Sequence, residues 1–391
     1  MNRPNLNIPK SVLEKLGRNL HLQPNHPVSI ISQLVIDYFK SLNRNFVVFT
    51  DASPIVTVEH NFDDLLIPSD HPARSTSDTY YFDSNTLLRT HTSAHQTQYL
   101  KEGLTSFLAI GDVYRKDEID RSHYPVFHQV EGVYIFDDEQ DVDVIANDLT
   151  NVLIGLCNVL FPECETRVND DYFPFTHPSF EVEVLHQGKW MEILGCGVIQ
   201  PEILLSCADS CPRLKNNDDV IKKGWAFGIG LDRLAMILFE IPDIRLLWVT
   251  DEKFTSQFEA GKISKFKSYS TLDPLEKDVS FWIPNDQLLL KPDATEKDET
   301  FIKGYRWLKE NDMSDIIRET ANSEYSDIIE SVTCFDQFWH PKTNRLSRAY
   351  RIKYSVPDPN MNNSADFTAL VNSLHAKIAS VLGDMLGVQI R

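Results

Sequence analysis

The sequence predicts an α+β protein with a larger unit built on an antiparallel sheet and a smaller unit at the C-terminal end. Three observations support this prediction. At 391 residues, the chain is longer than one hydrophobic core normally serves. Between about Thr90 and Phe136, short apolar runs alternate with charged turns, as in antiparallel strands. A polar stretch at Gly261–Asp273, rich in lysine and serine, offers little to bury and predicts a linker.

The larger unit is expected to span residues 28–260. Apolar residues recur at helical spacing in two places, and short β-rich runs separate them. In chain order we expect a helix at Val28–Leu42, a strand at Phe46–Phe49, an amphipathic helix at Val142–Phe161, strands within Phe180–Val198 and at Trp225–Ile229, and a helix at Leu231–Ile241. Residues 1–27 carry four basic residues against one acid, which fits a loose tail and a transit peptide equally well.

The smaller unit is expected to span residues 274–391, after a linker at 261–273. Its elements should be a strand at Val279–Ile283, a helix within Thr300–Leu308 or Asp315–Ala321, strands at Ile328–Phe338 and Arg348–Val356, a helix at Ala365–Leu386 and a strand at Val388–Ile390. The order βαββαβ is typical of a ferredoxin-like domain.

Composition limits the functions that fit the chain. The net charge of -19 argues against broad nucleic-acid binding, so any RNA contact needs a local basic patch. Such a patch is available between Gln337 and Pro357, which hold no acid. Its cations are Lys342, Arg345, Arg348, Arg351 and Lys353. Because no run of about 18 apolar residues is uninterrupted, no membrane span is expected.

The cysteines do not indicate a disulfide framework or a zinc site. Six cysteines in a chain of this length are expected to be reduced and mostly buried. Cys207 and Cys211 have a spacing that a metal pair could use, but no second pair of matching spacing follows. We therefore expect no zinc there.

Two segments carry the residues best suited to chemistry. In Gly111–Gly132, one strand delivers Arg115, and the next presents Phe127, Gln129 and Glu131 on one face, since strand residues two apart point the same way. Such a hairpin suits a nucleotide beside an amino group, although ordinary surface charge would give the same pattern. In Gly224–Arg233, glycines lead into a helix whose first turn holds an arginine, which a tightly packed turn would also explain.

Together these segments resemble the catalytic core of class II aminoacyl-tRNA synthetases. The first helix and strand with Pro54 look like their first motif, and Arg115 matches the arginine of the second. Gly228 and Gly230 with Arg233 match the third. These motifs leave the amino acid open, so a class II enzyme for another amino acid is one alternative.

Further segments resemble phenylalanyl-tRNA synthetases specifically. They read NFDDLLIPSDHPAR at Asn61–Arg74, LLRTHTSAHQ at Leu87–Gln96, YFPFTHPSF at Tyr172–Phe180, MEILGCGV at Met191–Val198 and GWAFGIGLDRLAM at Gly224–Met236. The C-terminal segments FDQFWHPKT and YRIKY resemble the anticodon-binding ferredoxin-like domain of that family. A catalytic core and an anticodon domain on one short chain is the layout of the mitochondrial form. The resemblance implies a monomer in the mitochondrial matrix.

The resemblance also implies roles for individual residues. Phe173 and Phe175 would wrap the phenylalanine ring over Ala226, and the amino acid's charged groups would meet His91, Ser93, Gln129 and Glu131. Arg115 and His123 would contact the phosphates of ATP, and Phe127 and Arg233 would sandwich the adenine. Ser93, Ala94, His95 and Gln96 should line the same cavity as Ser122, His123 and Tyr124. Glu192 lies near the ATP in this family and is a candidate Mg²⁺ ligand, and Gly228 and Gly230 admit the nucleotide.

The implied reaction joins phenylalanine to tRNA(Phe) in two steps. ATP is a substrate, and phenylalanyl-adenylate and pyrophosphate form first; the terminal ribose of the tRNA then takes the phenylalanine. Arg115, His123, Arg233 and Mg²⁺ would neutralise the phosphate charge. A second alternative, a non-catalytic RNA-binding relative, is disfavoured because both ATP arginines are present.

Overall fold

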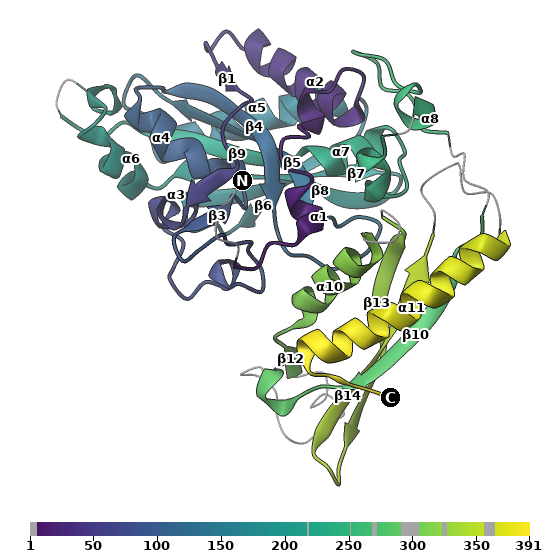
Figure 1. Ribbon diagram of the computed structural model, residues 1–391. Coiled ribbons are helices and arrows are strands. Elements are labelled where there is room, and N and C mark those ends of the chain that lie inside the picture. Colours follow the sequence, from purple (N-terminus) through teal and green to yellow (C-terminus); the bar gives the residue numbers. More distant parts are fainter. Residues whose placement is uncertain are drawn as a thin grey trace.

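The larger unit is built on one seven-stranded sheet. The computed structural model describes residues 6–216, 219–250, 252–267, 272–290, 305–322, 327–355 and 364–391. The sheet has the order β1-β4-β5-β9-β8-β7-β6 and lies in the upper unit of Figure 1. Its strands are β1 (Val47–Phe49), β4 (Ser106–Tyr114), β5 (Val126–Ile135), β6 (Thr166–Asp171), β7 (Thr176–His186), β8 (Lys189–Ile199) and β9 (Gly224–Gly230). Only β1 and β4 pair in parallel, so the predicted antiparallel sheet is confirmed.

Helices cover both faces of this sheet because its strands bury residues on both sides. In β4, Leu108 and Ile110 join the main core, whereas Phe107 and Ala109 join a second core on the opposite face. The main core is shared with α2 (Pro27–Ser41), α5 (Val142–Leu160) and α7 (Leu231–Leu238). The second core is shared with α4 (Gln96–Lys101) and α6 (Pro201–Ala208). The predicted helices and strands from Val28 to Ile241 are present within a few residues of their expected bounds.

Helix α5 is the one described helix that is long and apolar enough, by length and composition, to cross a membrane. In the fold its inward side chains, among them Ile145, Leu149 and Leu153, are buried in the main core. The helix packs on β7, β8 and β9. Its apolar character therefore belongs to the face that covers the sheet, as the amphipathic pattern indicates.

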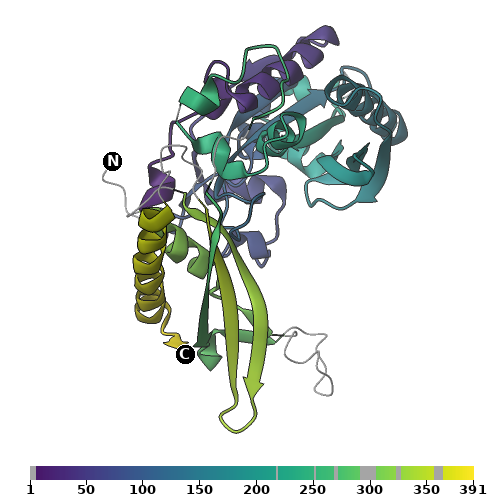
Figure 2. The ribbon, with the colours of Figure 1, turned by 90° about the vertical axis from the view of Figure 1, so that its right-hand side faces the viewer.

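The C-terminal unit has a four-stranded antiparallel sheet of order β13-β14-β10-β15. Its elements are β10 (Leu275–Trp282), α10 (Glu310–Asn322), β13 (Ile329–His340), β14 (Arg345–Tyr354), α11 (Ser364–Leu386) and β15 (Gln389–Ile390). This confirms the predicted βαββαβ order, and α11 lies along one side of the sheet (Figure 2). The predicted helix is the one near Asp315. Of the alternative near Thr300, residues 300–304 lie outside the described part, and Tyr305–Trp307 forms β12, paired with β11 (Leu288–Leu290).

Two local predictions were wrong. Residues 6–27 are not a loose tail: Ile8, Val12 and Leu20 are buried in the main core. The short helix α1 (Lys10–Leu13) packs against α10, where the backbone NH of Ser11 donates to Glu319. The segment from Thr90 to Lys101 is not a strand but a 3-10 turn followed by α4, which buries Gln96, Thr97, Tyr99 and Leu100 on one side. The other short elements are α3 (Val58–Asn61), α8 (Glu252–Thr255), β2 (Ile55–Thr57) and β3 (Thr86–Leu88).

The two units are in contact through ion pairs and hydrogen bonds with little exposure to water. Lys116 Nζ lies 2.7 Å from Asp312 Oδ1 of α10, and the hydroxyl of Tyr80 donates to Asp315 at 2.8 Å. Residues 268–271 of the predicted linker lie outside the described part, so the domain boundaries stay a prediction. The close contact places α10 beside the loop that joins β4 to β5.

Candidate active site

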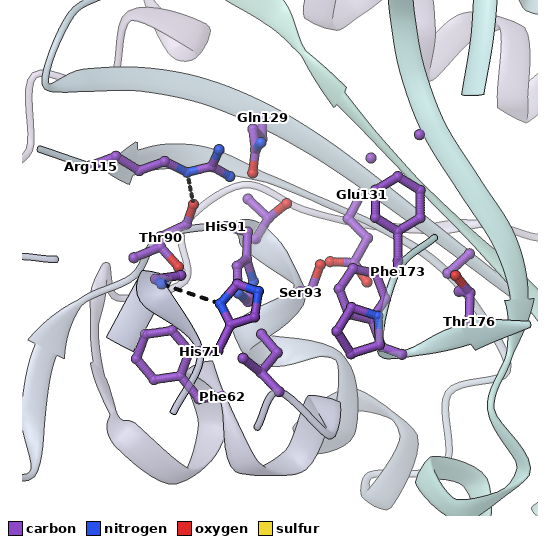
Figure 3. Close-up of a pocket in the computed structure, with 18 of the residues that line it drawn as sticks. Phe62, His71, Thr90, His91, Ser93, Arg115, Gln129, Glu131, Phe173 and Thr176 are labelled. Atoms are coloured by element: carbon purple, nitrogen blue, oxygen red, sulfur yellow. Dashed lines mark hydrogen bonds between the residues drawn. The ribbon is translucent and has the colours of Figure 1, made fainter. Parts of the chain in front are cut away.

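A cavity of about 760 Å³ opens on the face of the sheet that carries α4. Residues from several helices, strands and loops line it. Figure 3 shows Arg115 and Gln129 on one side of this cavity and Glu131 beside Phe173 on the other. The predicted residues that the structure brings together here are His91, Ser93, Gln96, Arg115, Gln129, Glu131, Phe173, Phe175, Glu192, Ala226 and Gly228. They come from the segment after β3 and the start of α4, from the loop between β4 and β5, from β5, β8 and β9, and from the segment between β6 and β7.

One end of the cavity is apolar and shaped for a flat ring. The rings of Phe173 and Phe175 are stacked, with centroids 5.8 Å apart and planes 15° apart. Gly195 of β8 makes room for this pair, because a Cβ at that position would lie 2.7 Å from Cζ of Phe173. Ala226 is buried and adds only a methyl group on the neighbouring strand. Because Phe173, Phe175 and Ala226 all have apolar side chains, this surface suits an uncharged aromatic ring.

Next to the apolar end lies a buried carboxyl group. Glu131 is 2% exposed, and neither of its carboxylate oxygens makes a hydrogen bond of normal geometry within the described residues. Burial raises the pKa of Glu131 to about 8, with the hydroxyl of Ser93 acting in the opposite direction. A buried acceptor without a partner is costly, so this group is ready for a donor such as an ammonium ion.

His91 adds a second unpaired polar group to the same cavity. Neither of its buried ring nitrogens makes a hydrogen bond of normal geometry within the described residues, although the backbone of Asn61 lies near enough to favour the protonated ring. Burial lowers the pKa of His91 to about 3, and the nearby Arg115 adds to this effect. The imidazole is therefore neutral near pH 7 and offers one donor and one acceptor to a ligand.

Arg115 is fixed at the mouth of the cavity. Its Nε donates to the backbone oxygen of Thr90 at 2.8 Å, and its guanidinium carbon lies 5.3 Å from the ring centroid of Phe127. Within the part of the chain described, no other hydrogen bond engages this guanidinium, so its outer NH groups are available. A planar cation with free parallel NH groups is suited to a phosphate.

Several predicted residues lie outside this cavity. Ser122, His123 and Tyr124 do not line it, which contradicts the expectation that they share it with Ser93–Gln96. These residues pack instead toward the C-terminal unit: the hydroxyl of Tyr124 donates to Asp327 at 2.8 Å, and Tyr124 and His123 line a small separate pocket with Arg318 and Asp327. The turn that carries His123 is thus held away from the cavity.

His123 in this turn is held by its own neighbours. It lies 2.7 Å from Asp120. Although burial lowers the pKa of His123, the hydrogen bond to Asp120 raises it above its ordinary value. A protonated imidazole is the form that would suit a phosphate ligand.

The remaining predicted residues do not line the cavity. Ala94 packs in a small core with Phe62, and His95 accepts from Arg89 at 3.0 Å, both behind the lining. Phe127, Gly230 and Arg233 also lie outside the lining, with Arg233 exposed in the first turn of α7.

The prediction missed other lining residues. These include Phe62, His71, Thr90, Lys116, Tyr172, Thr176, Cys196, Phe227 and Asn311. Phe62 and His71 fall within Asn61–Arg74. The sequence comparison indicated this segment as a whole but gave no role to any of its residues. Asn311 belongs to the C-terminal unit, and no sequence pattern indicates that this unit reaches the cavity.

The predicted RNA-binding cations differ in their surroundings. Arg348 is 5% exposed and donates to Glu310, so it is not available to phosphates, which contradicts its assignment. The strand alternation explains this, because Arg348 shares the buried face of Tyr350, Ile352 and Tyr354. Arg351 is paired with Asp278, and Lys353 with Glu330.

Lys342 and Arg345, by contrast, have no acidic partner within the described ranges. They lie at the turn between β13 and β14. The guanidinium of Arg345 lies 5.4 Å from the ring centroid of Trp282, and that of Arg391 lies 5.1 Å from it. Phe338 and Trp282 face each other across Ser347 of β14, on the side of the sheet opposite the buried face. A mixed aromatic and basic surface therefore exists at this end of the C-terminal unit.

Among the carboxylates that line the cavity, which include Asp78, Asp117 and Glu192, Glu192 is the predicted magnesium ligand. Glu192 is exposed on β8 and lines the cavity, and Mg²⁺ is commonly held by one or two carboxylates together with phosphates of a substrate. Elsewhere in the described residues, Glu118, Asp120 and His123 form a group close enough to share a metal ion, on the turn that contacts the C-terminal unit. Cys207 and Cys211 are buried free thiols.

Comparison with known proteins places this arrangement in a family. A family model described as tRNA synthetases class II core domain (F) matches residues 12–258. A phenylalanine–tRNA ligase of Arabidopsis thaliana, named chloroplastic/mitochondrial, is 42% identical over 99% of this chain and 83% of its own length. The chain belongs to the phenylalanine–tRNA ligases of class II.

Other members of the family cover the chain to different extents. The mitochondrial phenylalanine–tRNA ligase of Mus musculus is 38% identical over 98% of this chain and 85% of its own length. The phenylalanine–tRNA ligase alpha subunit of Coxiella burnetii (strain CbuK_Q154) is 40% identical over 64% of this chain and 75% of its own length. The organellar ligases therefore share nearly the whole chain, whereas the alpha subunit shares about two thirds of it.

Proposed function

We propose that this chain is a phenylalanine–tRNA ligase of mitochondrial translation, which activates phenylalanine with ATP and transfers it to tRNA(Phe). The observation that carries this proposal is the cavity with two unlike ends. Stacked phenylalanine rings lie at one end, a buried carboxyl group beside them, and an arginine with free NH groups at the mouth. A free amino acid with an aromatic side chain satisfies the first two, and a phosphate satisfies the third.

The proposed chemistry requires positioning rather than a protein nucleophile. The ring of phenylalanine would lie against Phe173 and Phe175, and its ammonium group would donate to Glu131. The carboxylate would then point toward Arg115 and attack the α-phosphorus of ATP in line, releasing pyrophosphate. Arg115 would offset the charge that develops on the α-phosphate and the reacting carboxylate. When bound, Mg²⁺ held by Glu192 would neutralise charge on the leaving phosphates.

Binding of the amino acid changes the state of Glu131. In the empty cavity the raised pKa keeps this carboxyl group largely protonated near pH 7. An ammonium group within hydrogen-bond distance favours the carboxylate, so binding of phenylalanine would release a proton from Glu131. The pair is then buried and charge-assisted, which holds the α-carbon of the substrate in one orientation.

The C-terminal unit is proposed to bind the anticodon region of the tRNA. Lys342 and Arg345 remain from the predicted cations. Arg345 lies beside Trp282, together with Phe338 and Arg391 on one side of the sheet, and Lys342 lies in the adjoining β13–β14 turn. Aromatic rings flanked by arginines stack unpaired bases and contact phosphates. This local surface answers the difficulty that a chain of net charge -19 poses for RNA binding.

We further propose that one chain suffices for the reaction and that it works in the mitochondrial matrix. The same chain supplies the cavity and the C-terminal unit, so no second subunit is required for either substrate. Small-angle scattering of the purified enzyme at several concentrations tests the first point. A mass of one chain is expected, and a stable dimer would contradict it.

Charging of tRNA tests the proposed function. Purified enzyme is incubated with ATP, Mg²⁺, labelled phenylalanine and tRNA(Phe), and acid-precipitable label is counted. We expect charging by the unmodified chain and a loss of at least about a hundredfold in Arg115→Ala, as for the removal of a group that stabilises transition-state charge. Arg213→Ala, an exposed arginine outside the cavity, should charge normally. RNA binding without charging would favour the alternative of a non-catalytic relative.

A further inference from the structure

The two residues that the family resemblance assigns to the faces of the adenine ring come from two separate elements. Phe127 lies on β5, and Arg233 lies in the first turn of α7. A slot for a flat purine ring works only if the spacing of its two walls is fixed, because stacking and cation–π contacts weaken as the faces separate. Something must therefore hold these two elements together at this point.

The regular sheet bonding ends just before this point. Strands β5 and β9 are paired up to Gln129 and Gly230, which is the last registered pair at that end. Beyond it, β9 turns into α7 and the backbone ladder stops. The next connection between the two elements is made by side chains.

That connection joins the sequence neighbours of the two proposed walls. The carboxylate of Asp232 accepts from the backbone NH of His128 at 2.6 Å, and its two oxygens lie 3.1 and 3.3 Å from Nδ1 of His128. His128 adjoins Phe127, and Asp232 adjoins Arg233. Both are buried, at 0% and 1% exposed, so no water competes for these bonds.

The position of each side chain fits this role. On a strand, consecutive side chains point to opposite faces, so His128 points into the protein where Phe127 points outward. In the first turn of α7, Asp232 is buried and Arg233 is exposed. Each wall residue is thus backed by a neighbour that is anchored inside.

Aromatic packing fixes the imidazole from behind. The ring of His128 is stacked on Trp248, with centroids 5.7 Å apart and planes 24° apart. Trp248 is in turn stacked on Tyr124 at 5.5 Å, and the ring of His21 from the N-terminal segment lies 5.4 Å from His128. These two ring contacts and its full burial support the imidazole in the orientation that faces Asp232.

We propose that Asp232 and His128 are positioning residues that set the distance between Phe127 and Arg233, and with it the fit of the adenine ring. Neither touches the nucleotide. This inference rests on the proposed function and on the assignment of Phe127 and Arg233 by the family resemblance, since it assumes that the adenine of ATP is bound between them. It predicts that breaking the pair weakens binding of the base but not binding of the amino acid or of phosphates.

Steady-state pyrophosphate exchange tests the proposal, with ATP and phenylalanine varied separately. In Asp232→Ala we expect the KM for ATP to rise about tenfold, because the adenine would lose the binding energy of about one stacking or cation–π contact. The KM for phenylalanine should change less than about twofold. His128→Phe keeps a ring against Trp248 but removes the Nδ1 donor and should shift the KM for ATP in the same direction. His128→Asn retains a donor near the position of Nδ1 and should restore much of the loss.

Two further measurements separate positioning from a general loss of structure. Inorganic tripolyphosphate carries phosphates without a base, so its inhibition constant should be unchanged in Asp232→Ala. Asp148→Asn is the matched control, because Asp148 also accepts hydrogen bonds between elements, from Trp225 and Arg44, away from the cavity. It should lower the melting temperature without changing the KM for ATP. If Asp232→Ala does not fold, Asp232→Asn keeps one acceptor for the backbone NH and is measured in its place.

The outcomes distinguish failure of the inference from failure of the proposed function. Equal changes in the KM values for ATP and phenylalanine, or no change in either, would overturn the positioning role. No exchange by the unmodified chain with any amino acid would overturn the proposed function instead. In that case titration with a fluorescent ribose-labelled ATP still decides the inference: an unchanged Kd in Asp232→Ala contradicts it, and a raised Kd supports it.

Discussion

The buried carboxyl group of Glu131 makes the stability of the empty enzyme depend on pH in a specific way. Burial raises its pKa from 4.5 to about 8 in the folded chain, while the unfolded chain keeps the ordinary value. Between these two values the folded state holds a proton that the unfolded state has released. The free energy of unfolding therefore falls as pH rises through this window, and it levels off above about pH 8.

Replacing Glu131 by glutamine removes this titration. Integrating the two pKa values from pH 5 to pH 8 gives a loss of roughly 3 kcal/mol in the unmodified chain that Glu131→Gln does not suffer. The fixed cost of burying an unpaired amide, about 1–3 kcal/mol, is the same at both pH values and cancels in this comparison. At each pH, the melting temperature of the unmodified chain is subtracted from that of Glu131→Gln. This difference should increase by several degrees from pH 5 to pH 8.

The same substitution should damage activity. Glutamine cannot balance the ammonium charge of phenylalanine, and breaking a buried charged pair costs about 2–5 kcal/mol. We expect kcat/KM for phenylalanine to fall about 30- to several thousandfold in pyrophosphate exchange. The variant would thus gain stability at alkaline pH as it loses its substrate.

Differential scanning fluorimetry of the ligand-free enzymes at pH 5, 6, 7 and 8 measures the effect. Glu192→Gln, the same change at an exposed carboxylate of the same cavity, is the control. A melting-temperature difference for Glu131→Gln that stays flat or shrinks from pH 5 to pH 8 would refute the reasoning, because Glu131 would then ionise like an exposed carboxyl group.

The remaining predictions concern the two substrates. Gly195→Ala should push the ring of Phe173 from its place and raise the KM for phenylalanine about tenfold, with the KM for ATP as the internal control; unchanged constants would contradict the packing argument. Tyrosine should support exchange about a hundredfold less efficiently than phenylalanine, since an apolar pocket rejects an added hydroxyl weakly; its absence under excess tyrosine would show a further rejecting group. Trp282→Ala should raise the KM for tRNA about tenfold in charging while leaving exchange intact, and an equal loss in both assays would argue for misfolding instead.

Much of the framework could be predicted because local patterns determine it. The amphipathic helix at Val142–Leu160 and the helix at Ser364–Leu386 have the periodicity of a helix with one buried face, and both are present. Strand alternation predicted that Phe127, Gln129 and Glu131 share a face, and the registry of β5 agrees. In these segments, burial follows directly from the spacing of the apolar residues.

The errors arose where distant parts of the chain meet. Arg348 was grouped with exposed cations, although its position in β14 places it on the face of Tyr350, and its partner Glu310 is far away in sequence. The turn with His123 was expected at the cavity, but its residues Tyr124 and His123 pack against Asp327 and Arg318 of the C-terminal unit. The N-terminal segment was read by its charge, whereas its apolar residue Ile8 joins the core.

The cavity itself could be predicted only in part. Its residues come from segments separated by more than a hundred positions, and no periodicity relates Phe173 to Glu131. The resemblance to a family supplied that grouping, and the structure brings the residues into one cavity. The buried state of Glu131 and the bonds between Asp232 and His128 required the structure, since both depend on what surrounds a side chain.

The central claim is that this cavity activates phenylalanine with ATP. Amino-acid-dependent ATP–pyrophosphate exchange tests it most directly, with each amino acid in a separate reaction and no tRNA present. The account predicts exchange with phenylalanine, weaker exchange with tyrosine, and loss of both in Arg115→Ala. Silence with every amino acid, or strongest exchange with one that is not aromatic, would contradict it.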